Sequence, residues 1–196
     1  MKNITRFFAL TFAVIAASFS VQAEEIKYQE HVIGKADAPV TLIEYASYTC
    51  PHCATFHNDV LPKIKKDFVD TGKVKVIFRD FPFERVGATA AMLSRCVAPS
   101  RFEGFTNLVM KQQAKWTQNQ NPLGALFKLA KLAGLSQENI DSCLSNEKLL
   151  DQIVAVRKEA MDKYGFNSTP SFLINGEKVV GGGEYERFKS IIESKL

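Results

Sequence analysis

Apolar and polar positions along the first half of the chain predict two strands. Residues 40–46 form a short run of β-branched and apolar residues, interrupted by one charge at Glu44, which is typical of a buried strand. Residues 74–78 alternate Lys75 with apolar neighbours and then meet Arg-Asp-Phe-Pro, which indicates a second strand and its exit.

An amphipathic helix is predicted between these strands, from about residue 51 to residue 69. Its apolar stripe recurs at steps of three and four and comprises Cys53, Phe56, His57, Val60, Leu61, Ile64 and Phe68. Pro51 suits the first helical position, where no backbone donor is needed. Pro62 should kink the helix or end it early.

The second half of the chain predicts a helical stretch followed by a hairpin. From about residue 84 to residue 164 three helical segments are separated by breakers at Pro99-Ser100, at residues 119–122 and at Gly134. Two strands, 171–174 and 178–180, then flank Asn175-Gly176, a strong hairpin signal, with a loop that can extend to Glu177. A short helix from about residue 184 follows, so the class is α/β with a large helical insertion.

The first residues predict a secretory signal peptide. Lys2 and Arg6 precede a thirteen-residue apolar run, 7–19, and small residues end at Ala23. A helix needs roughly 20 apolar residues to span a bilayer, so a retained anchor is the weaker interpretation. Cleavage after Ala23 leaves 173 residues (196 minus 23) and lowers the net charge from +4 to about +2.

Charge and cysteine content exclude two broad classes. The lysines are scattered rather than gathered in a basic tract, which argues against nucleic-acid binding. Four cysteines in 173 residues are too sparse for a disulfide scaffold, and 46% hydrophobic residues can supply a core. An exported chain nevertheless meets an oxidising compartment, where disulfides persist.

The segment Cys50-Pro51-His52-Cys53 carries the candidate chemistry. At a helix start the Cys50 sulfur faces unpaired N–H groups and the positive end of the helix dipole, which stabilise a thiolate. His52 can lower the pKa of Cys50 further by a hydrogen bond or, when protonated, by its charge. Such a thiol leaves readily in exchange, so the disulfide form should be oxidising.

Other interpretations of this motif have less support. A structural disulfide between residues three apart on a helix is uncommon. A zinc site needs two further ligands, but Cys96, Cys143, His31 and His57 form no second pair, and haem attachment needs histidine directly after the second cysteine. We therefore expect no metal and no cofactor. A non-catalytic exported protein that holds copper or zinc remains a competing hypothesis.

Residues 42–53, Leu-Ile-Glu-Tyr-Ala-Ser-Tyr-Thr-Cys-Pro-His-Cys, resemble the strand and active-site segment of the DsbA family, and Thr169-Pro170 resembles the loop that faces it. The resemblance implies a thioredoxin-like fold in two parts, 24–83 and 165–196, around a helical insertion at 84–164. It further implies oxidation of unfolded or reduced exported proteins in the periplasm, and reoxidation by a membrane partner of the DsbB type.

The same resemblance assigns roles to single residues. Cys50 would be the exposed nucleophile, Cys53 the resolving thiol, and Glu44 a buried carboxylate that passes protons to and from Cys53. Pro170 would follow a cis bond and, with Thr169, contact the client. An exposed edge-strand charge is the alternative for Glu44, and His31 and His57 are expected to be ordinary surface or half-buried histidines.

Two questions stay open at this stage. Cys96 and Cys143 fall on two predicted helices of the insertion and could form a disulfide or be two buried free thiols. Thr169 before the proline resembles some oxidases and the related isomerases, so isomerase or reductase activity is the runner-up. Such isomerases carry an N-terminal dimerisation domain, whereas here about fifteen residues lie between Ala23 and the first predicted strand. We therefore expect a monomer and an oxidase.

Overall fold

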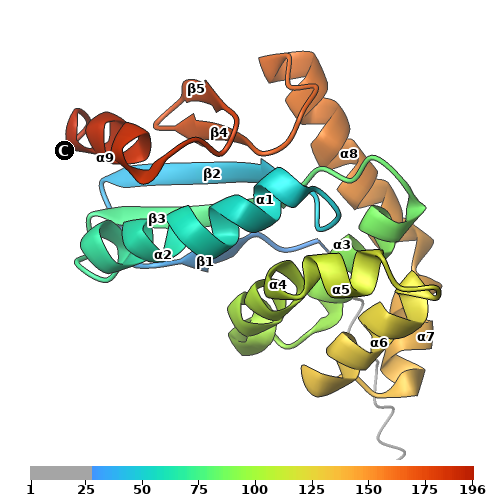
Figure 1. Ribbon diagram of the computed structural model, residues 1–196. Helices are drawn as coiled ribbons and strands as arrows, with labels where there is room; N and C mark the ends of the chain where they lie inside the picture. Colours follow the sequence, from blue (N-terminus) through green and yellow to red (C-terminus); the bar gives the residue numbers. More distant parts are fainter. Residues whose placement is uncertain (1–27) are drawn as a thin grey trace, which may run out of the picture.

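The computed structural model describes residues 28–196, so the expected signal peptide at residues 1–23 lies outside the described residues. A five-stranded sheet occupies one side of the molecule, and the helices α3 to α7 lie beside it (Figure 1). Strands β2 and β3 are parallel, and the other pairs are antiparallel. The order across the sheet is β1 (His31–Ile33), β3 (Val74–Asp80), β2 (Val40–Ala46), β4 (Ser171–Ile174) and β5 (Glu177–Val180).

The central strand β2 divides its side chains between the two faces of the sheet. Val40 and Leu42 pack with the helix that follows β2 and with α9 (Tyr185–Glu193), whereas Tyr45 packs with residues of α8 (Glu147–Tyr164). Because successive side chains in a strand point to opposite faces, Glu44 shares the face of Leu42. This places Glu44 under the helix that carries the cysteine pair.

The helix after β2 continues from Pro51 to Val69, so the expectation that Pro62 ends it early is wrong, whereas a kink at Pro62 stays a prediction. Two π-helical turns interrupt the regular α-helical hydrogen bonding of this helix. The Leu61 N–H, just before the proline, bonds back to the Phe56 carbonyl, and this wider turn passes a residue that has no N–H. The segments are α1 (Pro51–Thr55), η1 (Phe56–Val60), α2 (Leu61–Ile64) and η2 (Lys65–Val69).

Between β3 and β4 the chain is helical, as predicted, but it forms more helices than the three segments expected. Beyond the predicted breakers, the stretch also breaks after Lys111 and at the turn around Ser145. Within residues 28–196 no helix has the length and apolarity to cross a membrane. The elements are α3 (Arg85–Cys96), η3 (Pro99–Arg101), α4 (Phe102–Lys111), α5 (Gln113–Thr117), α6 (Pro122–Leu132), α7 (Gln137–Leu144) and α8.

The predicted hairpin is present, with a tighter turn than expected. Asn175 and Gly176 have φ angles of +46° and +88°, and both lie in the left-handed region that a two-residue hairpin turn requires. Glu177 belongs to β5 and not to the loop. The short edge strand β1 was not predicted, because three residues are too few to show alternation.

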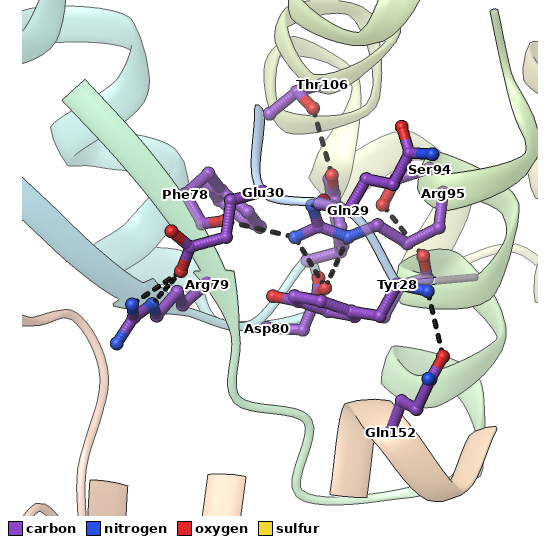
Figure 2. A network of polar contacts seen from close by, with 12 residues as sticks. Tyr28, Gln29, Glu30, Phe78, Arg79, Asp80, Ser94, Arg95, Thr106 and Gln152 are labelled. Atoms are coloured by element: carbon purple, nitrogen blue, oxygen red, sulfur yellow. Dashed lines mark hydrogen bonds and ion pairs between the residues drawn. The ribbon is translucent and has the colours of Figure 1, made fainter. Parts of the chain in front are cut away.

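A buried ion pair ties the start of the described chain, the sheet and the insertion together (Figure 2). Arg95 of α3 lies 2.6 Å from the Asp80 carboxylate of β3, and both side chains are essentially inaccessible. Arg95 also donates to the carbonyl oxygens of Gln29 and Phe78, and its guanidinium covers the Tyr28 ring at 4.3 Å. The insertion is thereby fixed to the sheet.

Candidate functional site

The two cysteines lie where β2 leads into α1. The strand ends at Ala46, and Cys50 is the residue immediately before the helix, with Pro51 at its first position. Cys50 is partly exposed and Cys53 is fully buried. Cys50 can therefore be reached from solvent, whereas Cys53 cannot.

The insertion holds the loop that carries Cys50. The side-chain amide of Gln113, in α5, donates to the carbonyl oxygens of Tyr48 and Cys50, at 2.8 Å each. Gln113 is itself buried, so these bonds are shielded from water. Sequence reasoning missed this residue, because a single glutamine in a helical pattern gives no signal of what it contacts.

The loop before β4 faces the cysteine pair. The Thr169–Pro170 peptide bond is cis, and the Cys50 sulfur lies 3.3 Å from the Thr169 carbonyl oxygen, to which it donates when it is protonated. The Thr169 hydroxyl is buried and makes no hydrogen bond of ordinary geometry among the described residues, but it lies close enough to the Cys50 sulfur to lower the pKa of that thiol. Thr169 and Cys50 are thus brought together although 119 residues separate them.

The two thiols differ sharply in acidity. The pKa of Cys50 is lowered from 9.0 to about 5, most strongly by a hydrogen bond from the Cys53 thiol and further by the Thr169 side chain and the backbone N–H groups of Cys53 and His52, against the effect of burial. The pKa of Cys53 is raised, first by burial and then by the Cys50 sulfur and the charge of Glu44. At neutral pH the reduced pair thus holds one thiolate and one thiol.

The His52 side chain plays a smaller part in this arrangement than the sequence suggested. His52 is exposed, and it lowers the pKa of Cys50 through its backbone N–H. A contribution from the charge of the imidazolium remains a prediction.

Glu44 is fully buried in a central strand, which excludes the alternative of an exposed edge charge. Its Oε2 atom lies 2.8 Å from Nε2 of His57, which belongs to η1. His57 is 6% exposed, so the expectation of a surface or half-buried histidine without a special partner is wrong. The signal was present, because His57 falls on the apolar stripe one helical turn after Cys53.

His31, the other histidine expected to be ordinary, lies in β1, with Phe78 of β3 between it and Glu44, and it does not contact Glu44. Its ring stacks on Phe102 with 3.9 Å between ring centroids. Burial, and secondly the Arg95 charge, lowers the pKa of His31 to about 4.

Cys96 and Cys143 form a disulfide between the end of α3 and α7, with 6.1 Å between their Cα atoms. They are therefore not two free thiols. Within residues 28–196, no group of three or more His, Cys, Asp or Glu side chains is placed to hold a metal ion.

Comparisons with known proteins agree with this architecture. A thioredoxin family model matches residues 27–194. The crystal structure of alpha-DsbA1 from Wolbachia pipientis has a TM-score of 0.79 and 35% identity, covering 84% of this chain and 89% of that one. Oxidised BdbD from Bacillus subtilis has a TM-score of 0.76 and 31% identity, covering 85% and 92%.

Sequence relatives point the same way. The disulfide bond formation protein D of Bacillus subtilis is 32% identical over 170 residues, which cover 84% of this chain and 76% of that protein. A putative protein-disulfide oxidoreductase of Rickettsia typhi is 33% identical over 153 residues, or 78% of this chain and 57% of the relative. The match spans only 52% to 59% of the length of this and two further rickettsial relatives.

These matches extend over nearly all of the described residues and include both the sheet and the inserted helices. The predicted thioredoxin-like fold is therefore confirmed, and the chain belongs to the thioredoxin family, among its DsbA-like members.

Proposed function

We propose that this protein is a thiol-disulfide oxidoreductase that introduces disulfide bonds into exported proteins through Cys50 and Cys53. The observation that carries the proposal is the unequal pair, a partly exposed Cys50 with a pKa of about 5 in front of a buried Cys53 whose pKa is raised. An exposed low-pKa sulfur with a resolving thiol behind it is the arrangement that thiol-disulfide exchange requires.

The exchange proceeds in two balanced steps. A client thiolate attacks the Cys50 sulfur of the oxidised pair, the Cys50–Cys53 bond breaks, and Cys53 leaves with the bonding electrons and takes up a proton. A second client thiolate then attacks the client sulfur of the mixed disulfide and releases Cys50 as a thiolate. The client loses two electrons and the pair gains them. Glu44, whose charge acts on Cys53, supplies and removes the proton at that sulfur.

Oxidation is the favoured direction because the reduced form holds a stabilised thiolate. Stabilising the reduced pair makes its disulfide easier to reduce, and this drives the oxidation of clients. An isomerase or a reductase of the same fold is the second candidate, and its activity would appear as reshuffling of wrongly paired clients.

The loop at Thr169–Pro170 is proposed to bind the client backbone. Clients differ in sequence but share a main chain, so an extended segment added beside the loop before β4 suits many of them. Pro170 has no N–H group that could compete for the client's carbonyls. Pro51 begins the active-site helix, and His52 adds to the acidity of Cys50.

Location and partners complete the proposal. The signal-peptide pattern at residues 1–23 supports export to the periplasm, where unfolded or reduced proteins are the clients and a membrane protein of the DsbB type reoxidises the pair. We propose a monomer in which residues 24–83 and 165–196 form the thioredoxin-like part and residues 84–164 the insertion. We propose no metal, cofactor or nucleic acid as a partner.

The deciding experiment is the equilibrium of the Cys50–Cys53 pair with glutathione, read by alkylation of the free thiols, together with oxidation of a reduced unfolded client. An oxidising potential and rapid client oxidation support the proposal. Dominant reshuffling activity would favour the isomerase, and stoichiometric copper or zinc in protein purified without added metal would favour a metal-binding role.

A further inference from the structure

A cavity of about 410 Å³ lies between the part of the helix that follows Cys53, from His57 to Val69, and α4 of the insertion. Its apolar walls carry three charged side chains, Lys65, Glu103 and Lys111. The side chains of Lys65 and Glu103 are 39% and 41% exposed, so this rim of the cavity meets solvent. A cavity of this size with polar groups in its lining can hold water.

His57 connects this cavity with the buried carboxylate. Its ring lines the cavity, and its Nε2 atom lies 2.8 Å from Oε2 of Glu44. The second ring nitrogen, Nδ1, has no hydrogen-bond partner among the described residues. The ring of Phe78 packs against His57 edge to face at 5.6 Å and helps to fix its orientation. One ring nitrogen is thus engaged. The other is buried without a partner beside the cavity, so a small rotation of the ring has to bring it to water.

Glu44 needs such a connection if it is to exchange protons with Cys53. The carboxylate is fully buried, and its Oε1 atom has no hydrogen-bond partner in the described part of the chain. A buried group that gives a proton to Cys53 must be protonated again before the next cycle. An imidazole can accept a proton at one nitrogen while it gives one from the other, so His57 can reload it.

We propose that His57 relays protons between water in this cavity and Glu44, and through Glu44 to Cys53. This inference rests on the proposed exchange activity. When Cys53 leaves as a thiolate, it takes the Glu44 proton, Glu44 takes the Nε2 proton of His57, and Nδ1 accepts a proton from water. The reverse order removes the Cys53 proton when that sulfur must attack a mixed disulfide.

The relay works in a mixed electrostatic environment. Glu44 faces His57 from β2, and the Cys53 thiol lies on α1, one helical turn before His57. Across the cavity stand Lys65 from η2 and Glu103 and Lys111 from α4. Lys65 lies 2.9 Å from Asp70 and 3.9 Å from Glu103, so opposite charges partly balance at the rim.

The test compares two histidine-to-glutamine variants, His57→Gln and His31→Gln. The glutamine amide can keep a hydrogen bond to Glu44 but cannot relay a proton, and His31 provides a matched histidine that does not contact Glu44. Each oxidised protein is reduced by excess dithiothreitol from about pH 5 to about pH 8. The ratio of each variant's rate to the wild-type rate cancels the titration of the reductant.

We expect His57→Gln to be slower by about tenfold or more near neutral pH, with a rate ratio that changes with pH, and His31→Gln to match the wild type. Added imidazole should accelerate His57→Ala in a saturable way and leave His31→Ala unchanged. A His57→Gln rate ratio that is constant across pH, together with no imidazole rescue of His57→Ala, would overturn the relay. Wild-type protein that fails to exchange would instead refute the proposed function, so the two failures are distinguishable.

Discussion

Lowering the pH should selectively weaken the reduced form of this protein, because its stability depends on the Cys50 thiolate. In the folded protein the pKa of Cys50 is about 5, below its ordinary value of 9.0. Between pH 5 and pH 9 the folded state therefore binds fewer protons than the unfolded state. The stabilisation is therefore present at high pH and is lost as the pH falls through about 5. When the pH falls from 7 to 5, these two units lower the free energy of unfolding of the reduced protein by ~2.7 kcal/mol. Cys50 is partly exposed, and solvent screening reduces this to ~2 kcal/mol.

The assay is urea unfolding of the reduced and the oxidised protein at a series of pH values, beside titration of the thiolate by its ultraviolet absorbance. The difference between the two forms isolates the cysteine pair, because all other titrating groups, His31 included, are common to both. Peptide mapping must show that the Cys96–Cys143 bond stays intact in the reduced preparation. A stabilisation of ~2 kcal/mol corresponds to ~45 mV in the potential of the pair.

The reasoning is refuted if the stability difference between the reduced and oxidised forms does not change between about pH 5 and about pH 7, or if Cys50 titrates like a free thiol. The variant Cys50→Ser provides the control, since it has no thiolate at this position and its free energy of unfolding should follow pH as that of the oxidised wild type does. Thr169→Val identifies a cause, because it removes a hydroxyl that lowers the pKa of Cys50 while preserving the side-chain volume. The pKa of Cys50 should rise in this variant.

Three further predictions follow from other contacts. Pro170→Ala should let mixed disulfides between Cys50 and clients accumulate, because the loop opposite the pair changes while attack at Cys50 survives; unchanged trapping and unchanged oxidation rates would limit Pro170 to a structural role. Replacing Cys96 and Cys143 by alanine should lower the free energy of unfolding by up to ~4 kcal/mol on the loop-entropy estimate, as measured in urea. Arg95→Met should lower the free energy of unfolding by ~3 to 5 kcal/mol, because it leaves Asp80 buried and unpaired. The double variant Arg95→Met with Asp80→Leu should recover part of that loss. Equal stability of the single and double variants would contradict this.

Local patterns in the sequence were sufficient for the strands that carry the site. The predicted strand at residues 40–46 coincides with β2, and the one at 74–78 lies within β3, because both are buried and rich in β-branched residues. The start of α1 was also readable, since Pro51 and the apolar stripe mark it. These elements place Cys50, Cys53 and Glu44, which are close together in the sequence.

Contacts between distant segments could not be predicted in this way. Gln113 reaches the Cys50 loop from 63 residues away, and its helix gives no sign of which face it turns to the sheet. The two π-helical turns were hidden too, because π turns depend on how the helix packs and not on a residue pattern. The apolar stripe includes His57, but its partner Glu44 lies in a different element, so the pair could not be predicted from the helix pattern alone.

The two buried carboxylates of neighbouring strands show how the choice of partner separates a structural charge from one that can exchange protons. Asp80 lies in β3 and is paired with Arg95, which keeps its proton at any pH a protein experiences, so this pair can only hold the insertion in place (Figure 2). Glu44 lies in β2 and is paired with a histidine, whose two ring nitrogens can accept a proton at one atom and give one from the other. Since both carboxylates are equally inaccessible, burial alone does not distinguish them. The difference lies in the partner, and the carboxylate that is paired with an imidazole is the one whose charge acts on Cys53.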